Sequence, residues 1–558
     1  MLRKLSIGWG GNIINNSAIF HPNSWVINKD IKTNIPTVFL SIFLLGPILS
    51  LVFTTFESNQ DLWVHLVDTV LPIYVLNTFL LFIGVLTLSV VLGVSTAWIV
   101  SHYSFFGKKI IEWALILPIA CPAYIVAYVY TDLLEYAGPV QSFIRNIIGF
   151  NSAAEYYFPE IRSVMGAVFV MGFVLYPYIY ILARTGFNNS PRSLYETARL
   201  YGRNKFFAVG LPLCRPYIVA GLALVAMEVL SDFGTVEYFS VQTLTLGMFN
   251  VWIGMNSISA ASQIAVVTFM FIVILLILER TARSNQKYSE TSKRFNNISP
   301  SNLDFKKALF AITFCSVPIL LGFIVPIIIL ISNVLMGLEA DSFFTIVPVV
   351  LNTILVGFTA TAIIIFFAFF SASSAYFCKS RVLVHIYNIA ATGYAFPGTM
   401  LAIGVVIFVG FIDQLAGNLF FLGGTIYVMI FALIVRFYAI PYGGIISGYS
   451  RIPSNLFDAS KSLGYSQTST SMKITIPLIR TSIIATAILT FVDIVKELPM
   501  TLILRPFNFE TLATYTYQFA HDELMIEASL PAFFIVLTGL IPIILLQNHL
   551  NSFFYSKN

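Results

Sequence analysis

Four carboxylates lie within apolar sequence, where a charged side chain needs a partner or a function. Glu228 and Asp232 are four residues apart, and Asp493 and Glu497 repeat this spacing 265 residues later. Residues four apart share one face of a helix, and carboxylate oxygens are suitable ligands for hard cations. A charge near the bilayer centre costs at least about 2.5 kcal/mol on insertion scales. The four acids are therefore candidates for a translocation path.

A purely structural role explains the same residues. Asp493 can pair with Lys496 one turn away, and acids near a helix end can simply be solvated. No other pattern indicates catalysis. The chain has no G-x-x-x-x-G-K-[ST] phosphate loop, no nucleophile elbow and no ligand spacing among its six histidines. We therefore expect a non-enzyme with no catalytic residue, no bound cofactor and no confident metal site.

Composition indicates the fold class. Hydrophobic residues make up 58% of the 558 residues and charged residues only 10%, whereas a soluble domain carries roughly 25% charged residues. The sequence predicts an all-α polytopic membrane protein in contact with lipid, and nucleic-acid binding is excluded. Four cysteines far apart are interpreted as small hydrophobes. Twelve apolar runs are long enough to span a bilayer, at about residues 37–53, 73–100, 110–131, 164–184, 216–233, 260–278, 308–332, 347–377, 383–411, 419–440, 481–498 and 526–547.

The basic residues predict the orientation of these spans. Residues 1–36 and a linker at 280–307 are polar and basic, which places both in the cytoplasm by the positive-inside rule. With twelve spans, both termini lie inside. Of the 31 Lys and Arg residues, only Arg145, Arg162, Lys496 and Arg505 fall on the outer side, and Arg436 falls inside a span.

The chain contains an internal duplication. Residues 75–78 (VLNT) recur at 350–353, and Pro122 matches Pro397 at the same offset of 275. Both copies run in the same direction, so the sequence predicts two parallel halves of six spans each, residues 37–279 and 308–558, related by a pseudo-two-fold axis along the membrane normal. Changes of offset place about thirteen extra residues in the outer loop after residue 131.

A polar stretch from Asn455 to Pro477 predicts a short helix between two spans. Asn455 and Asp458 can satisfy free amides at its start, and Gly464 can take the left-handed conformation that ends it. Leu456, Ala459 and Leu463 share one face, while Pro477 suits the first turn of the next span.

The stretch from Ser193 to Pro212 has the same design, with Ser193 and Glu196 as capping box, Ala198 as the small residue and Gly202 as the stop. Two such helices fit a groove on a two-fold cytoplasmic partner. The simpler alternative is a pair of well-capped interfacial helices.

These residues resemble the EAA motif (EAA, three residues, G, nine residues, I-x-L-P) of type I permeases in binding-protein-dependent ABC importers. The second copy keeps every spacing; the first is three residues shorter after its glycine. The resemblance implies that loops at about 185–215 and 441–480 couple to an ATPase. The matching residues are Glu196, Thr197, Ala198, Gly202, Pro212, Asp458, Ala459, Ser460, Gly464 and Pro477.

The resemblance also implies partners and a location. Two copies of a cytoplasmic ATPase would hold ATP and Mg, a periplasmic or surface-tethered binding protein would deliver the substrate, and the chain would reside in the bacterial inner membrane. Residues 231–252 and 496–523 look most like fused permeases of the ferric iron group. Fused permeases for thiamine, phosphonate or another small solute share the architecture, and a secondary transporter is a further alternative.

Overall fold

A computed structural model describes residues 27–56, 60–150, 152–284, 300–337, 340–377, 380–417 and 422–555. In these ranges the regular secondary structure is helical except for one pair of two-residue parallel strands, β1 (Tyr103–Ser104) and β2 (Ser301–Asn302). An all-α membrane protein was the prediction, and it is confirmed.

Within the described residues, nine helices are long and apolar enough to cross a membrane. Hydrogen bonding closed within each helix is what allows such segments to lie in lipid. The crossing segments belong to α1 (Ile27–Thr54), α3 (Leu71–His102), α7 (Val164–Asn188), α9 (Leu211–Ser231), α13 (Phe305–Ile319) continued through η6 (Leu320–Ile324) by α14 (Val325–Met336), α15 (Ala340–Phe377), α17 (Gly398–Leu415), α22 (Ile476–Val495) and α25 (Met525–Tyr555).

Two bent pairs bring the number of spans in the described chain to as many as eleven. One bends by 92° and joins α4 (Lys108–Ala114) and η2 (Leu117–Ala120) to α5 (Ala123–Leu134) and α6 (Pro139–Ile148); the other bends by 44° between α18 (Ile426–Phe437) and α19 (Ala439–Ser450). The remaining predicted run, at 260–278, falls on α12 (Ile258–Ser284). The apolar part of this helix, Ile258–Ile274, counts among the shorter apolar helices.

Shorter helices connect the spans. Their bounds are α2 (Gln60–Thr69), η3 (Ala153–Glu155), α8 (Arg192–Leu200), η4 (Phe206–Gly210), α10 (Gly234–Tyr238), α11 (Leu244–Phe249), η5 (Asn250–Gly254), α16 (Arg381–Ala390), η7 (Gly393–Ala395), α20 (Ser454–Ser462), α21 (Gln467–Thr470), η8 (Ser471–Thr475), α23 (Pro499–Leu504) and α24 (Leu512–His521).

The duplicated prolines break the chain in the same way in both halves. Pro122 precedes α5 with φ −57° and ψ 140°, and Pro397 precedes α17 with φ −54° and ψ 142°. A short 3₁₀ turn comes just before each proline. The run predicted at 383–411 is accordingly divided, because α16 ends before Pro397 and α17 begins after it.

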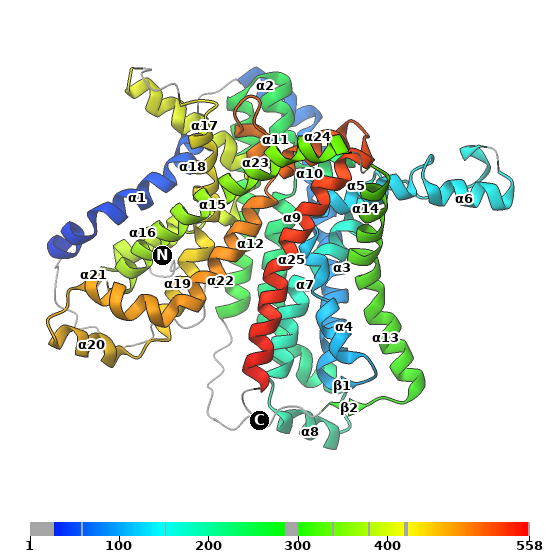
Figure 1. The fold of residues 1–558 in the computed structure, drawn as a ribbon, viewed down its shortest axis with the longest axis horizontal. Coiled ribbons are helices and arrows are strands. Elements are labelled where there is room, and N and C mark those ends of the chain that lie inside the picture. The colour runs from blue at the N-terminus through cyan, green and yellow to red at the C-terminus, as the bar shows by residue number, and fades with distance from the viewer. Residues whose placement is uncertain are drawn as a thin grey trace. The chain divides into compact units, whose positions relative to one another are not determined.

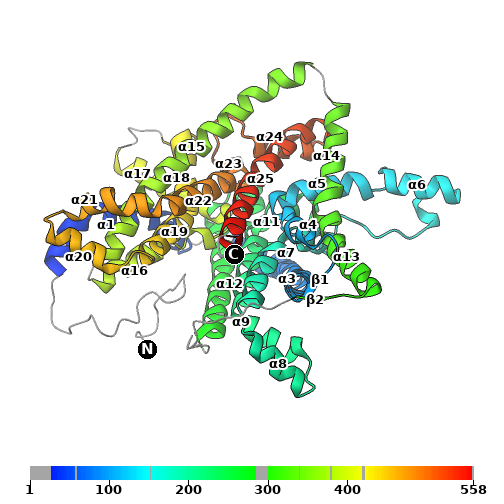
Figure 2. The ribbon, with the colours of Figure 1, turned by 60° about the horizontal axis from the view of Figure 1, so that its bottom comes forward.

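The chain folds into two compact units that each draw on both halves. One unit combines Met1–Glu57 with Val347–Thr511, and the other combines Ser58–Ile346 with Leu512–Asn558. In the first unit α1 packs on α16 and α17 (Figure 1). In the second unit α14 packs on α25 and α5 (Figure 2). The first helix of the first half therefore packs on the second half, and α14 of the second half packs on both α25 of its own half and α5 of the first half.

Glycines allow the central helices of the second unit to approach closely. A Cβ added to Gly93 of α3 would lie 2.9 Å from the Cβ of Ile179 in α7. A Cβ on Gly221 of α9 would lie 2.8 Å from the Cα of the same isoleucine. Small residues at such contacts are the usual device for packing helices in membranes, where lipid provides no hydrophobic drive between them. This packing fixes the ends of α7 and α9, between which α8 lies.

Candidate coupling helices and outer loops

The two short polar helices form where the duplicated motifs predict them. α8 and α20 are each nine residues long, and each follows a proline, Pro191 or Pro453, in extended conformation. The prediction of side-chain caps is wrong, because no side chain caps the start of either helix. Glu196 instead forms an ion pair with Arg192 at 2.7 Å. The prolines explain the difference, because they begin each helix earlier than the serine or asparagine would.

Both helices end as predicted, in a left-handed glycine. Gly202 has φ +64° and Gly464 has φ +79°. In the first copy the amide of Arg203 donates to the carbonyl of Ala198 at 2.9 Å; in the second the amide of Tyr465 donates to that of Ser460 at 3.1 Å. These bonds define a Schellman motif, which satisfies the free carbonyls of the last turn.

Aromatic side chains anchor α8 to the end of α3. Tyr195 is buried, and its ring lies 5.0 Å from that of His102 and 6.1 Å from that of Trp98. Phe187, at the end of α7, contacts the same His102 ring at 5.7 Å. Ala198 is buried on the same side of the helix as Tyr195. A movement of α8 therefore displaces the ends of α3 and α7.

The second copy repeats this anchor with related residues. Phe457 occupies the position of Tyr195 and is buried, with its ring 5.2 Å from Phe377 and 5.4 Å from Tyr376 at the end of α15. Ser460 is buried beside it, and its hydroxyl lies 2.6 Å from that of Thr470. These anchors were not predicted from the sequence, although both motifs have an aromatic residue at the same place.

The opposite faces of α8 and α20 are exposed, and each carries apolar side chains among polar ones. In α20 the predicted face of Leu456, Ala459 and Leu463 is exposed throughout. In α8 and its C-terminal cap the equivalent residues are Leu194, Thr197 and Tyr201, all exposed as well. The small residues of each motif are thus divided: Thr197 and Ala459 belong to the exposed face, whereas Ala198 and Ser460 point into the anchor. Glu196 and Asp458 lie on the exposed surface between them.

The following spans restart at the predicted prolines. Pro212 and Pro477 are the second residues of α9 and α22. A single π-helical turn, η4 or η8, precedes each of them. The segment between the Schellman motif and the span is therefore helical in both copies despite its different length.

Asp232 caps the short helix that follows α9. Its Oδ1 accepts hydrogen bonds from the amides of Thr235 at 3.0 Å and Val236 at 3.2 Å, and its Oδ2 accepts one from the hydroxyl of Thr235 at 2.9 Å. These are the bonds that a helix N-terminus needs, so the carboxylate holds α10 in place.

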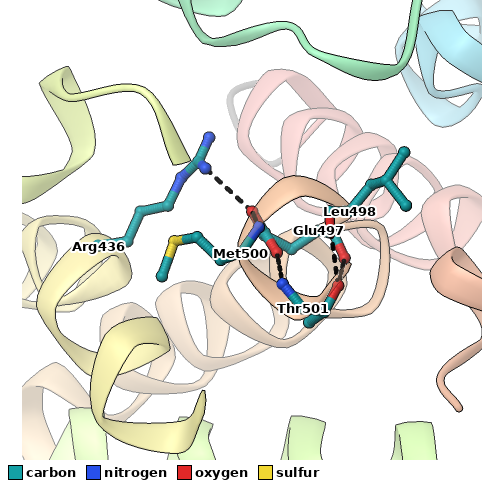
Figure 3. Close-up of polar contacts among 5 residues, drawn as sticks. All are labelled: Arg436, Glu497, Leu498, Met500 and Thr501. Carbon is teal, nitrogen blue, oxygen red and sulfur yellow. Dashed lines mark hydrogen bonds and ion pairs between the residues drawn. The ribbon is translucent and has the colours of Figure 1, made fainter. Parts of the chain in front are cut away.

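Glu497 plays the equivalent part at the start of α23, as Figure 3 shows. Its carboxylate accepts hydrogen bonds from the amides of Met500 at 3.1 Å and Thr501 at 3.0 Å, and it pairs with the guanidinium of Arg436 at 3.0 Å. The side chain of Glu497 is buried, and that of Arg436 is 12% exposed. Gly398 leaves room for the pair, because a Cβ there would lie 2.9 Å from the carboxylate.

The other two acids differ in their surroundings. Asp493 forms an ion pair with Lys496 at 2.9 Å, the alternative foreseen from the sequence. Glu228 lies one turn before Asp232 and adds its charge to the same neighbourhood. The two acid pairs belong to different units. Among the described residues, no group of three or more His, Cys, Asp or Glu side chains could hold a metal ion.

The repeated VLNT sequence ties the loop after α9, and the loop after α22, to the span that carries the repeat. Asn77 donates to the carbonyl of Gln242 at 3.0 Å, and Asn352 donates to that of Glu510 at 3.2 Å. Each loop is thus held at one end by an acid and at the other by an asparagine. The repeat was visible in the sequence, but its contact with a loop about 160 residues away was not.

Comparison with known proteins agrees with this geometry. Residues 89–284 match the family model of the binding-protein-dependent transport system inner membrane component. An Fe(3+)-transport system permease protein of Haemophilus influenzae is 22% identical over 85% of this chain and 89% of its own length. Residues 89–284 therefore carry the membrane domain of this family, and the chain as a whole is similar to permeases of binding-protein-dependent ABC transporters. Permeases of this family work with an ATPase and a substrate-binding protein.

Other relatives of the permease match a shorter part of it. A probable molybdenum ABC transporter permease protein of Haloferax volcanii is 25% identical over 44% of this chain and 87% of its own length. A molybdenum transport system permease protein of Haemophilus influenzae is 25% identical over 34% of this chain and 82% of its own length. Each of these relatives matches over most of its own length but covers less than half of this chain. This coverage is expected if the chain consists of two fused permease halves.

Proposed function

We propose that this permease moves ferric iron from an external binding protein into the cytoplasm, driven by two copies of an ATPase that dock on α8 and α20. The observation that supports docking is the pair of equivalent helices, each with a buried aromatic anchor, a fixed glycine end and an exposed apolar face. In this proposal both termini and the linker at 280–307 lie in the cytoplasm, and the outer loops face the binding protein.

The iron substrate is supported by the relative that spans both halves, whose name specifies Fe(3+) transport. The molybdenum permeases among the relatives support molybdate as the competing substrate. The two ions differ in charge sign, so a transport assay separates them clearly. Glu228, Asp232, Asp493 and Glu497 remain candidates for the path of a cation, although the hydrogen bonds of Asp232 and Glu497 favour a capping role.

The experiment is uptake into proteoliposomes that contain the permease with its ATPase and enclose ATP. We expect accumulation of radioactive iron when the iron-loaded binding protein is added outside, and none without ATP. Uptake of molybdate in place of iron would overturn the substrate, and uptake that needs an ion gradient but no ATP would overturn the whole proposal.

The proposed docking face of α20 can be tested by replacing one of its apolar side chains with a charged one. Leu456→Glu should prevent co-purification of the ATPase, because it puts a carboxylate in the apolar contact. Asn455→Glu is the matched control, since Asn455 is its exposed polar neighbour in α20. Equal loss in both variants would mean that the face itself is not the docking surface.

A further inference from the structure

The outer loop of the second half carries a tight turn with a protruding aromatic side chain. We call residues Pro506 to Phe509 the Phe507 turn. The amide of Phe509 donates to the carbonyl of Pro506 at 3.2 Å, and Asn508 between them has φ +59°. A left-handed residue at the third position is the mark of a type II turn, and asparagine tolerates it better than most residues do. The second position is Phe507, which is 93% exposed.

The base of the Phe507 turn is held by two further contacts. Arg505 and Glu510 form an ion pair across it. The carbonyl of Glu510 also accepts the hydrogen bond from Asn352 in α15. The turn is therefore fixed to a membrane span, and Phe507 is presented by a rigid support. An exposed large apolar side chain on a rigid support costs little conformational entropy when a partner covers it.

The first half also has a left-handed residue in this loop, but there it ends helix α10, because the amide of Val241 donates to the carbonyl of Val236 at 2.8 Å. Ser240, 268 residues before Asn508, is also left-handed, with φ +55°. The residue before it is Phe239, equivalent to Phe507, and it is only 1% exposed. The two loops thus share a left-handed residue preceded by a phenylalanine but differ in the surrounding backbone. The helix end of the first half buries its ring, whereas the turn of the second half leaves its ring exposed.

The chain direction determines which compartment the Phe507 turn faces. α22 begins shortly after the coupling helix α20 and runs for 20 residues before the loop starts. At about 1.5 Å per residue this span measures roughly 30 Å, the thickness of the bilayer core. The turn therefore lies on the opposite side of the membrane from the ATPase docking faces, in the compartment of the substrate-binding protein.

We infer that Phe507 is an anchor for the substrate-binding protein, inserted into an apolar pocket on that protein's surface. The inference rests on the proposed function and adds the residue that makes the contact. A few buried aromatic anchors usually dominate such interfaces. Lipid is a poorer occupant, because the side chains beside the ring are the charged Arg505 and Glu510 and the exposed amide of Asn508.

The test measures binding to the intact permease–ATPase complex in nanodiscs, using a purified binding protein that stimulates the wild-type ATPase. Phe507→Ala should weaken that affinity roughly tenfold, the effect of about 1.4 kcal/mol. Phe411→Ala is the matched control, because Phe411 is a 55% exposed phenylalanine near the end of α17. Asn508→Gly, which keeps the left-handed turn, should bind like the wild type.

A photoreactive phenylalanine analogue at position 507 identifies the occupant directly. Cross-links to the binding protein, stronger than those from position 411, would support the inference. Cross-links to lipid alone, or unchanged affinity in Phe507→Ala, would overturn it while binding-protein stimulation of the wild-type ATPase persists. If the wild-type complex is stimulated by no binding protein, the proposed function fails and this inference fails with it.

Discussion

Arg436 and Glu497 are 61 residues apart in the sequence and form a buried ion pair in the second half that has no equivalent in the first. In the first half, Val174 stands at the position related to Arg436, and Asp232 at the position related to Glu497. Asp232 therefore caps α10 without an arginine at that position. The duplicated halves have therefore kept the capping carboxylate and diverged in how its charge is balanced.

Removing the charge of Glu497 should destabilise the permease. Glu497→Gln leaves the Arg436 guanidinium buried without its counterion, which typically costs about 3–5 kcal/mol. We expect a lower thermal unfolding midpoint in detergent, with partial recovery in the double variant Arg436→Met, Glu497→Gln. A midpoint equal to that of the wild type in the single variant would show that water or lipid neutralises Arg436.

Substitutions of Asp232 distinguish a capping role of its carboxylate from a role in cation transport. Asp232→Asn retains an oxygen that can accept the bonds from Thr235 and Val236, whereas Asp232→Ala loses them at a cost of about 1 kcal/mol. If the carboxylate acts as a cap, iron uptake stays near the wild-type rate in the asparagine variant and falls in the alanine variant. A large fall in both, with the complex intact, would assign the charge to the translocation path.

The left-handed glycine of α20 should be needed for coupling. A side chain in this conformation costs roughly 1–2 kcal/mol, and a Cβ on Gly464 would meet nothing within 4 Å, so strain is the only effect. We expect Gly464→Val to lower transport per ATP hydrolysed, and Gly202→Val to act in the same direction. Gly443→Ala is the control, since Gly443 has equal space within α19 and no left-handed φ.

The aromatic anchor predicts a second way to uncouple the transporter. Phe457→Ala removes the ring that joins α20 to Tyr376 and Phe377, and buried Phe→Ala changes cost about 3–5 kcal/mol. The exposed face of α20 is left intact. The ATPase should therefore still co-purify and hydrolyse ATP while uptake falls. Phe457→Tyr, which restores the ring found at Tyr195 in the first half, should recover much of the uptake.

Membrane orientation can be measured with an impermeant thiol reagent in a background without the four native cysteines. Exposed Asn146 and Ser462 lie on predicted outer and inner sides, respectively. Cysteine at 146 should react in whole cells, and cysteine at 462 only after permeabilisation. The opposite pattern would reverse the topology and place α20 on the side of the binding protein.

Local features of this protein could be predicted from sequence, and contacts between distant segments could not. The ends of α8 and α20 followed from Gly202 and Gly464, because a left-handed cap depends on a few neighbouring residues. The helix starts were wrong since Pro191 and Pro453 compete with the serine and asparagine as starting points. The pairing of Arg436 with Glu497 depends on how α18 packs with α23, which no local pattern specifies.

The exchange of first helices between halves has a consequence for biosynthesis. The unit that begins with α1 also needs residues up to Thr511, and the unit that begins at Ser58 needs α25. Neither unit can close while the ribosome has made only the first half, so α1 waits in the membrane for α16 and α17, which are synthesised later. A single gene that encodes both halves guarantees that those partners arrive in equal number, on the same chain and within one round of translation.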